Sequence, residues 1–233
     1  MLVTTTTAER AASELRERIA SGELRPGQRL AEERLARVLQ VSRNTLRESF
    51  RLLAHDGLVD HVVNRGVFVR QLAEHDVRDL YRLRRMVECS ALREFARRTR
   101  GVGAAQRAAL LADLDGAVRS GERAAEEGRW AEIPTADLEF HRCLTALAGS
   151  ARADELMGRA MAELRLVFWV MAGSREFHEP YLRRNRALVG MLTDGDVDGA
   201  EQELIDYLDE AETDLLRIYG MIQRYGEPST RTR

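Results

Sequence analysis

The fold is decided by residues 41–69, which read VSRNTLRESFRLLAHDGLVDHVVNRGVFV. Serine is among the residues that best cap the start of a helix, and glycine is among those that best end one. Ser42 and Gly57 therefore predict a helix from Arg43 to His55. The segment from Leu58 to Val69 is rich in valine and is interrupted by Asn64-Arg65-Gly66, which predicts a β-hairpin with its turn at these residues.

Two further helices are predicted upstream of this stretch. The four threonines Thr4 to Thr7 can cap a helix over residues 8–20, which Ser21-Gly22 ends. After a turn at Pro26-Gly27, a short helix leads from residue 30 to Leu39. Two short helices joined by a tight turn and followed by a hairpin form a winged helix-turn-helix. Residues 1–72 are therefore predicted to be a DNA-binding domain of this kind.

The second helix of such a motif enters the major groove and presents hydrogen-bond donors to bases and phosphates. Leu46, Phe50 and Leu53 share one face of the predicted helix and should be buried, so Arg43 and Asn44 project away from them. The alternative is an ordinary solvated face of charged residues. The order of cap, turn and hairpin favours DNA binding. The candidate DNA-binding residues on this helix are Ser42, Arg43, Asn44, Thr45 and Arg47.

The residues described above, together with others at fixed spacing, make the segment 8–70 resemble the GntR family of bacterial regulators. The shared pattern comprises Leu24-x-Pro26-Gly27-x-x-Leu30-x-Glu32-x-x-Leu35-Ala36, Val41-Ser42-Arg43-x-x-x-Arg47-Glu48, Asp56-Gly57-Leu58-Val59 and Arg65-Gly66-x-x-Val69. The resemblance implies DNA contacts from Arg43, Asn44 and Arg47 of the recognition helix and from Arg65 and Gly66 of the wing.

Two positions depart from the family pattern. Some relatives have a DNA-contacting arginine on the preceding helix, where this chain has Glu33 with Arg34 beside it. Arg34 is therefore added to the candidate DNA-binding residues. Relatives often place glycine where this chain has Gln40, and glutamine costs about 1 kcal/mol if the turn requires a positive φ.

The distribution of charge agrees with a DNA-facing N-terminus. The 36 basic residues are all arginine, against 38 acidic ones. Residues 1–70 hold 12 arginines and 9 acids, whereas residues 71–233 hold 24 arginines and 29 acids. A positive N-terminal part suits a nucleic-acid partner.

The sequence predicts a cytoplasmic protein. No apolar run approaches the roughly 18 residues of a membrane helix, and the N-terminus lacks the pattern of a signal peptide. Cys89 and Cys143 match no zinc or disulfide spacing and are interpreted as small core residues in a reducing compartment.

From Glu74 onward the pattern is helical almost throughout, so residues 73–222 are predicted to be an all-helical domain for effector binding and dimerisation. The fold class is therefore mainly α, with an N-terminal winged helix-turn-helix and a C-terminal all-α bundle. Residues 223–233 are predicted to be a disordered tail. Helices are expected at 74–98, 104–127, 133–148, 151–172, 179–193 and 196–219.

This half resembles the C-terminal helical (FCD-type) domain of the FadR subfamily. The resemblance is carried by Leu83-Arg84-x-x-Val87-Glu88, by Asp137-x-x-x-His141 and by the final pair of helices. It implies a pocket for a small molecule inside the bundle. In many members a divalent metal is held there by an Asp and a His four residues apart and by a His on each of the last two helices, and organic acids bind at the metal.

Hydrophobic stripes place polar residues at the same interior. Asp137 and His141 share an apolar helix face, and Arg84, Asn185 and Tyr207 each lie within an apolar stripe of another helix. The candidate effector pocket is therefore Arg84, Asp137, His141, Asn185 and Tyr207. Arg84 is expected to bind a carboxylate group of the effector.

No cofactor is favoured for this pocket. The two later family histidines fall on Asn185 and Tyr207, which leaves Asp137 and His141 as the metal ligands if a metal is present, and two protein ligands rarely hold one tightly. His178 lies in a predicted loop and could contribute only if that loop folds inward. A divalent metal is therefore a minor possibility.

Two interpretations of the polar cluster stay open. In one, the five residues line a metal-free effector pocket, which we favour because five inward polar groups exceed what a core normally tolerates. In the other, Asp137 and His141 hydrogen-bond each other and fill the core. Phe168 and Trp169 are expected to be core residues, with pocket walls as the alternative.

The predicted function is a sequence-specific transcriptional regulator, a repressor, that binds a palindromic operator as a homodimer and responds to a small-molecule effector. It is not expected to be an enzyme or to bind membranes. A metal-dependent hydrolase using Asp137 and His141 is the main alternative, but no general base or nucleophile motif accompanies them. A protein-interaction module is a third possibility, which the arginine-rich recognition helix disfavours.

Overall fold

The computed structural model describes residues 6–168 and 175–225. Within these ranges the chain forms two compact units, one reaching to Ala73 and one starting at Glu74, with the residues of the eighth helix from Ala162 grouped with the first. No helix in the described ranges has both the length and the apolar character needed to cross a membrane.

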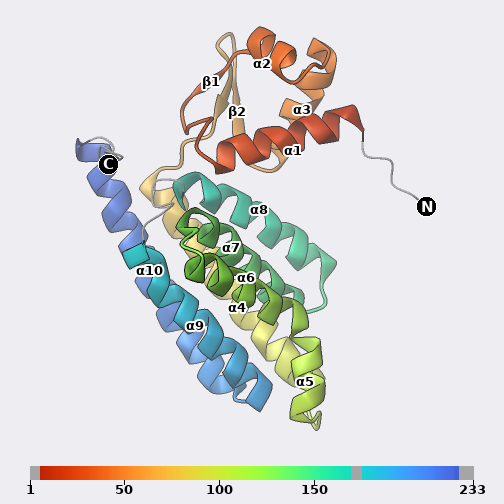
Figure 1. Ribbon diagram of the computed structural model, residues 1–233, viewed down its shortest axis with the longest axis vertical. Coiled ribbons are helices and arrows are strands. Elements are labelled where there is room, and N and C mark those ends of the chain that lie inside the picture. Colours follow the sequence, from red (N-terminus) through yellow and green to blue (C-terminus); the bar gives the residue numbers. More distant parts are fainter. Residues whose placement is uncertain (1–5, 169–174, 226–233) are drawn as a thin grey trace. The chain divides into compact units, whose positions relative to one another are not determined.

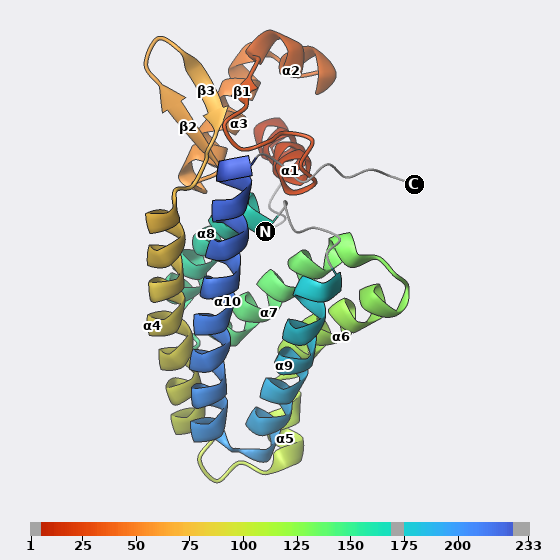
Figure 2. The same cartoon turned by 90° about the vertical axis from the view of Figure 1, so that its left-hand side faces the viewer.

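The first unit is a winged helix-turn-helix, as predicted. Its helices are α1 (Thr7–Ala20), α2 (Glu32–Val38) and α3 (Arg43–His55), and its strands are β1 (Arg29–Leu30), β2 (Val59–Val62) and β3 (Gly66–Val69). All strand pairs are antiparallel, in the order β1-β3-β2 (Figure 2). β1 was not predicted, because two residues are too short to show a strand periodicity.

Local signals set the helices of this unit. Thr6 caps α1 in a reciprocal arrangement with Glu9, and the Ser42 side chain caps α3. Leu46 and Phe50 of α3 are fully buried, and α3 packs against α1. The Ser49 hydroxyl donates to the Ala8 carbonyl at 2.9 Å, which joins the two helices. The core thereby holds one face of α3 and leaves the opposite face in solvent.

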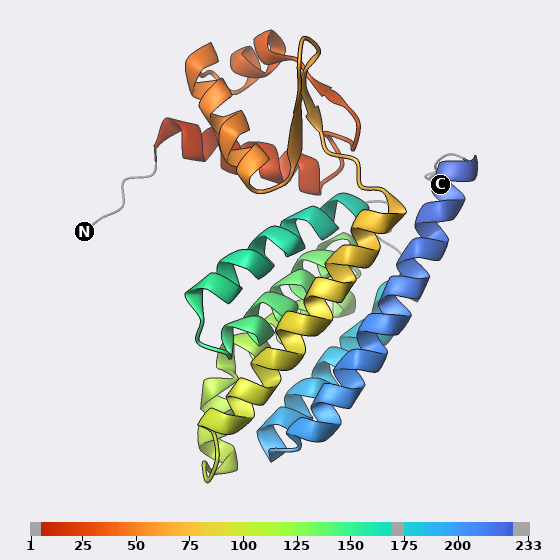
Figure 3. The same ribbon diagram turned by 180° about the vertical axis from the view of Figure 1, so that it is seen from behind.

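The second unit is a helical bundle, also as predicted (Figure 1). Its long helices α4 and α10 run side by side (Figure 3), α9 packs against α10, and α7 packs against α4, α6 and α9. Because α7 has these three neighbours, polar residues on several of its faces can meet partners from other helices. The helices from Glu74 onward are α4 (Glu74–Arg98), α5 (Ala104–Leu110), α6 (Ala112–Glu126), the 3-10 helix η1 (Trp130–Glu132), α7 (Ile133–Ala146), α8 (Ala151–Phe168), α9 (Arg175–Asp194) and α10 (Val197–Tyr225). Of these, α8 belongs to the second unit only as far as Met161.

At three places the described helices depart from the predicted ones by a break or by more than two residues. The single helix expected over 104–127 is two, α5 and α6, which meet at the fully buried Leu111; no Gly or Pro marks this break. α9 begins at Arg175 instead of 179, and Pro180 therefore lies inside the helix. α10 continues to Tyr225, into the segment predicted as tail. Trp169 and the tail residues 226–233 lie outside the described residues.

Candidate functional site

The recognition helix α3 presents a polar face at its N-terminus. The Ser42 hydroxyl accepts a hydrogen bond from the Thr45 backbone N–H at 3.1 Å, and the two hydroxyls are 2.8 Å apart. Arg43, Asn44 and Arg47 are exposed, on the side opposite the buried Leu46-containing face. Three side chains with donor groups thus project from the first turns of the helix, where the free N–H groups also favour phosphate.

Two arginines of this face are paired with acids of the preceding helix α2. The Arg43 guanidinium donates to the Glu33 carboxylate at 2.6 Å, and Arg47 donates to Glu32 at 3.1 Å. Arg34 of α2 is exposed. The polar surface of the helix-turn-helix is therefore a mixture of arginine and glutamate side chains, and not a purely basic one.

The turn between α2 and α3 requires a left-handed residue. Gln40 has φ +53°, the positive value that the family's glycine would adopt without a steric penalty. In the wing, Asn64 has φ +59° and Gly66 has φ +104°. Arg65, between them, is exposed and holds its guanidinium carbon 5.7 Å from the centroid of the Phe68 ring. The wing thus presents an arginine at its tip.

The five residues predicted for the effector pocket meet in one network, in which four are buried and Asp137 is half-buried. Tyr207 of α10 donates to Asp137 Oδ1 at 2.9 Å, and Asn185 of α9 donates to the same oxygen at 2.8 Å. The Tyr207 hydroxyl also lies 3.2 Å from His141 Nε2. Tyr207 therefore bridges Asp137 and His141. The second interpretation of the cluster had expected these two residues to hydrogen-bond each other directly, and they do not.

Glu88 of α4 completes the network and was not among the predicted site residues. Its Oε1 accepts from Arg84 Nε at 2.9 Å, and its Oε2 lies 2.7 Å from His141 Nδ1. Arg84 and Glu88 are four residues apart on α4, so the spacing of a helical ion pair was a signal in the sequence. The bond to His141 joins residues 53 positions apart in sequence, and no local pattern predicts it.

The charges of the network are stabilised by one another. Burial alone would raise the pKa of the Glu88 carboxyl, but His141 and Arg84 together lower it below its ordinary value. Burial, and then the charge of Asp137, raise the pKa of the Tyr207 hydroxyl well above its ordinary value. Glu88 is thus an anion beside Arg84, and Tyr207 keeps the proton that it donates.

Three buried polar atoms of this region have no hydrogen-bond partner among the described residues: Arg84 Nη2, Tyr81 OH and Asn185 Oδ1. Arg84 is only 1% exposed, and its guanidinium carbon lies 4.9 Å from the centroid of the Tyr81 ring. Leaving a buried donor unsatisfied is costly, and native proteins rarely do so without a reason. The free donor of Arg84 is therefore available to an additional acceptor.

The residues at the family's metal positions do not fit a metal ion. Asp137 Oδ1 already accepts from Asn185 and Tyr207, and the Tyr207 hydroxyl faces His141 Nε2. Among the described residues, no group of three or more His, Cys, Asp or Glu side chains could hold a metal. Hydrogen-bond donors stand where two ligands would be required.

His178 lies in α9 and not in a loop, contrary to our expectation. It is 4% exposed, and its ring lies 5.0 Å from that of Phe177. The loop prediction failed because the helix begins at Arg175, four residues before the predicted start at 179. His178 therefore takes its position from the helix itself and needs no loop movement to face the bundle.

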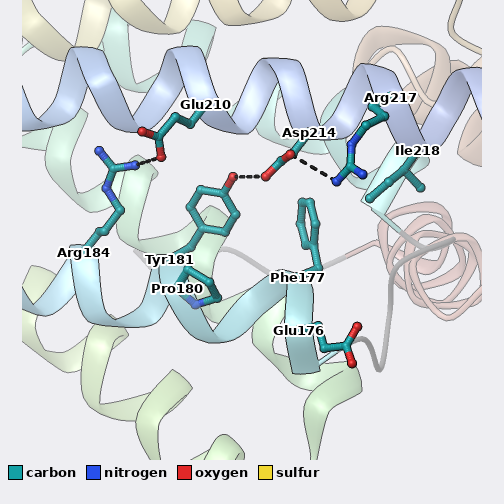
Figure 4. Close-up of a pocket in the computed structure, with 9 residues that line it drawn as sticks. All are labelled: Glu176, Phe177, Pro180, Tyr181, Arg184, Glu210, Asp214, Arg217 and Ile218. Atoms are coloured by element: carbon teal, nitrogen blue, oxygen red, sulfur yellow. Dashed lines mark hydrogen bonds and ion pairs between the residues drawn. The ribbon is translucent and has the colours of Figure 1, made fainter.

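A pocket of about 250 Å³ opens between α9 and α10 (Figure 4). Its polar side includes Tyr181, whose hydroxyl donates to Asp214 at 3.1 Å, and Arg184, which is paired with Glu210. The rings of Tyr181 and Tyr207 are 5.1 Å apart, and the Arg184 guanidinium lies 5.2 Å from the Tyr207 ring. Two residues of the pocket thus contact the buried network directly.

Comparison with known proteins agrees with both halves of this description. The profile of the family described as "Bacterial regulatory proteins, gntR family" matches residues 7–69, and that of the FCD domain matches residues 79–210. The chain belongs to the GntR family and carries an FCD domain. It is therefore a DNA-binding transcriptional regulator with an effector-binding domain.

Individual relatives are regulators too. The Nta operon transcriptional regulator of Aminobacter aminovorans is 33% identical over 159 residues, covering 68% of this chain and 72% of that protein. The crystal structure of a putative GntR transcriptional regulator from Rhodococcus sp. RHA1 superimposes with a TM-score of 0.78 at 39% identity, covering 90% of this chain and 97% of that one. The Escherichia coli repressor RspR is 24% identical over 193 residues, 83% of this chain and 82% of that protein. These families and relatives are not enzymes, and the alternative of a metal-dependent hydrolase has no support.

Proposed function

We propose that this GntR regulator is a repressor that binds a palindromic operator as a homodimer and that a small organic carboxylate controls its DNA affinity. The DNA contacts come from Arg34, Ser42, Arg43, Asn44, Thr45, Arg47, Arg65 and Gly66. The effector site is the network of Arg84, Asp137, His141, Asn185 and Tyr207, extended by Glu88 and Tyr81, and it works without a metal. Residues 1–72 read DNA, and residues 73–222 bind the effector and the second protomer.

The unsatisfied donor of Arg84 carries the proposal of a carboxylate effector. A guanidinium presents donors in a fixed planar fork, and carboxylates are its best-matched acceptors. Glu88 takes Arg84 Nε, while Nη2 stays without a partner among the described residues. The Tyr81 hydroxyl, also unsatisfied, offers a second donor within the same region. A carboxylate satisfies both at once.

The pocket between α9 and α10 supplies the route to this site. His141 and Tyr207 are at most 2% exposed, so an effector must displace a covering side chain. Tyr181 and Arg184 both line the pocket and contact the Tyr207 ring. Movement of these two side chains opens the network to the pocket. The assignment as a repressor is supported by the similarity to RspR, which is named as one.

Tyr81→Phe tests the effector site without disturbing the fold, because the hydroxyl that it removes has no hydrogen-bond partner among the described residues. We expect the melting temperature to stay the same or rise, since an unsatisfied buried group is lost. Carboxylates that shift the melting temperature of the native protein, chosen from a panel of small aliphatic and aromatic acids, should bind Tyr81→Phe several-fold more weakly. Equal affinity of both proteins in calorimetric titration would contradict the assignment of Tyr81.

Metal independence is tested by elemental analysis. We expect the protein purified without chelator to contain far less than one transition metal ion per chain, and EDTA to leave its operator binding and its response to the carboxylate unchanged. Asn185→His combined with Tyr207→His serves as the matched control, because it restores four ligands and should then bind Zn²⁺ or Ni²⁺. A stoichiometric metal in the native protein would refute this part of the proposal.

A further inference from the structure

Two acids of α2 hold the two arginines that the recognition helix offers to DNA. Glu33 pairs with Arg43 at 2.6 Å and Glu32 pairs with Arg47 at 3.1 Å, and both arginines keep about 60% or more of their side-chain surface exposed (64% and 60%). Each carboxylate thus sits within hydrogen-bonding distance of a guanidinium that is proposed to reach base edges. Both pairs connect α2 to α3 across the turn at Gln40.

The other proposed DNA-contacting arginines are not paired in this way. In the described part of the chain, no hydrogen bond or ion pair to an acid is found for Arg34 or for Arg65, and Arg65 stacks over Phe68. Among the proposed DNA-contacting arginines, Glu32 and Glu33 therefore act selectively on Arg47 and Arg43 of the recognition helix. Because Glu32 and Glu33 lie in the first turn of α2, their carboxylates also reduce the positive charge that an approaching phosphate meets.

The physical consequence differs between specific and non-specific DNA. Affinity for non-specific DNA arises almost entirely from attraction between basic side chains and phosphates, and nearby carboxylates weaken that attraction. On an operator, guanine O6 and N7 replace the carboxylate as acceptors for the guanidinium. Exposed ion pairs are weak, so such an exchange costs little where a correct base is present.

We propose that Glu32 and Glu33 are specificity-determining residues: they occupy Arg47 and Arg43 in the DNA-free protein and release them only to matching base acceptors. This inference rests on the proposed assignment of α3 as the recognition helix. Glu33 stands where some relatives have a DNA-contacting arginine. The inference gives this difference a role, because a glutamate at this position suppresses binding to unrelated DNA.

The test compares two duplexes with the variants Glu33→Gln and Glu32→Gln. One duplex is selected from a randomised pool with the native protein, and the other is its scrambled sequence. We expect affinity for the scrambled duplex to rise by about fivefold per variant, the effect of removing one unit charge close to a phosphate. Affinity for the selected duplex should change by less than about twofold. The ratio of the affinity for the selected duplex to that for the scrambled duplex should therefore fall.

Glu23→Gln is the matched control, because it removes the same charge from an exposed pair with Arg18 outside α2 and α3. It should leave both affinities nearly unchanged. The inference is wrong if Glu33→Gln and Glu32→Gln behave like Glu23→Gln, or if both duplexes gain affinity equally. The variants Arg43→Ala and Arg47→Ala distinguish a failure of this inference from a failure of the proposed function. If they also leave the affinity for the selected duplex unchanged, α3 is wrongly assigned as the recognition helix.

Discussion

At the scale of single residues, Glu88 links two members of the buried network, although it was not predicted for it. Its two carboxylate oxygens serve Arg84 and His141 separately, and all three residues are at most 1% exposed. An ion pair at such depth contributes little net stability, but removing one partner leaves an uncompensated charge in the core. Loss of the Glu88 carboxylate is therefore expected to destabilise the bundle strongly.

Glu88→Gln should lower the free energy of unfolding by about 3–5 kcal/mol, since Arg84 is then buried without its anion. Urea denaturation followed by circular dichroism measures this change. Glu94→Gln makes the same substitution on the same helix in an exposed pair with Arg97 and should produce a far smaller shift. If the two variants are equally stable, the Glu88 carboxylate does not compensate the charge of the buried Arg84.

Burial also determines the chemistry of the cysteines. Burial raises the pKa of the Cys89 thiol to about 11, and only the thiolate reacts with disulfide reagents. In a Cys143→Ala variant, which leaves Cys89 as the sole thiol, roughly one molecule in a thousand carries a thiolate at pH 8. We expect DTNB to react slowly with the native variant, faster as the pH rises toward 11, and at once in denaturant. Rapid reaction of the native variant at neutral pH would contradict the burial of Cys89.

At the scale of elements, the helix-turn-helix carries a strained turn. Gln40 adopts φ +53°, where a side chain with a Cβ is disfavoured. Gln40→Gly should raise the stability of the domain by at most about 1 kcal/mol, because relief of strain is partly offset by the greater freedom of glycine in the unfolded chain. Thermal unfolding measures the change.

Asn64→Gly is the control for this prediction. Asn64 has a similar φ of +59°, but asparagine tolerates the left-handed region better than glutamine does. The gain in stability at position 64 should therefore be smaller than that at position 40. A loss of stability in Gln40→Gly would show that the glutamine side chain stabilises the turn by contacts that outweigh its strain.

At the scale of the whole molecule, one winged helix reads only half of a two-fold symmetric site. We expect the protein to be a dimer in light scattering at micromolar concentration and to bind one palindromic duplex per dimer. Binding should weaken steeply as salt rises, in proportion to the number of phosphates contacted. A monomer that binds a single half-site with the same affinity as the full palindrome would contradict the proposed assembly.

The effector and the DNA are proposed to be coupled through this assembly. Saturating carboxylate should lower the affinity for the operator duplex by about 5–150-fold, the usual range of coupling between two sites. Fluorescence anisotropy with labelled operator measures this effect, and Tyr81→Phe should need a higher carboxylate concentration for the same release. If the carboxylate tightens operator binding instead, the protein is not a repressor that is relieved by its effector.

The sequence alone determined the winged helix-turn-helix and the positions of α3 and the wing, because helix caps, turn residues and hydrophobic spacing act over a few residues. The stripes of α4, α7, α9 and α10 likewise placed five polar residues in one interior. Only the tertiary structure decided that Glu88 joins them, that Tyr207 bridges Asp137 and His141, and that Glu32 and Glu33 hold Arg47 and Arg43. These contacts join side chains from different helices, and their geometry depends on how the helices pack, which no local pattern encodes.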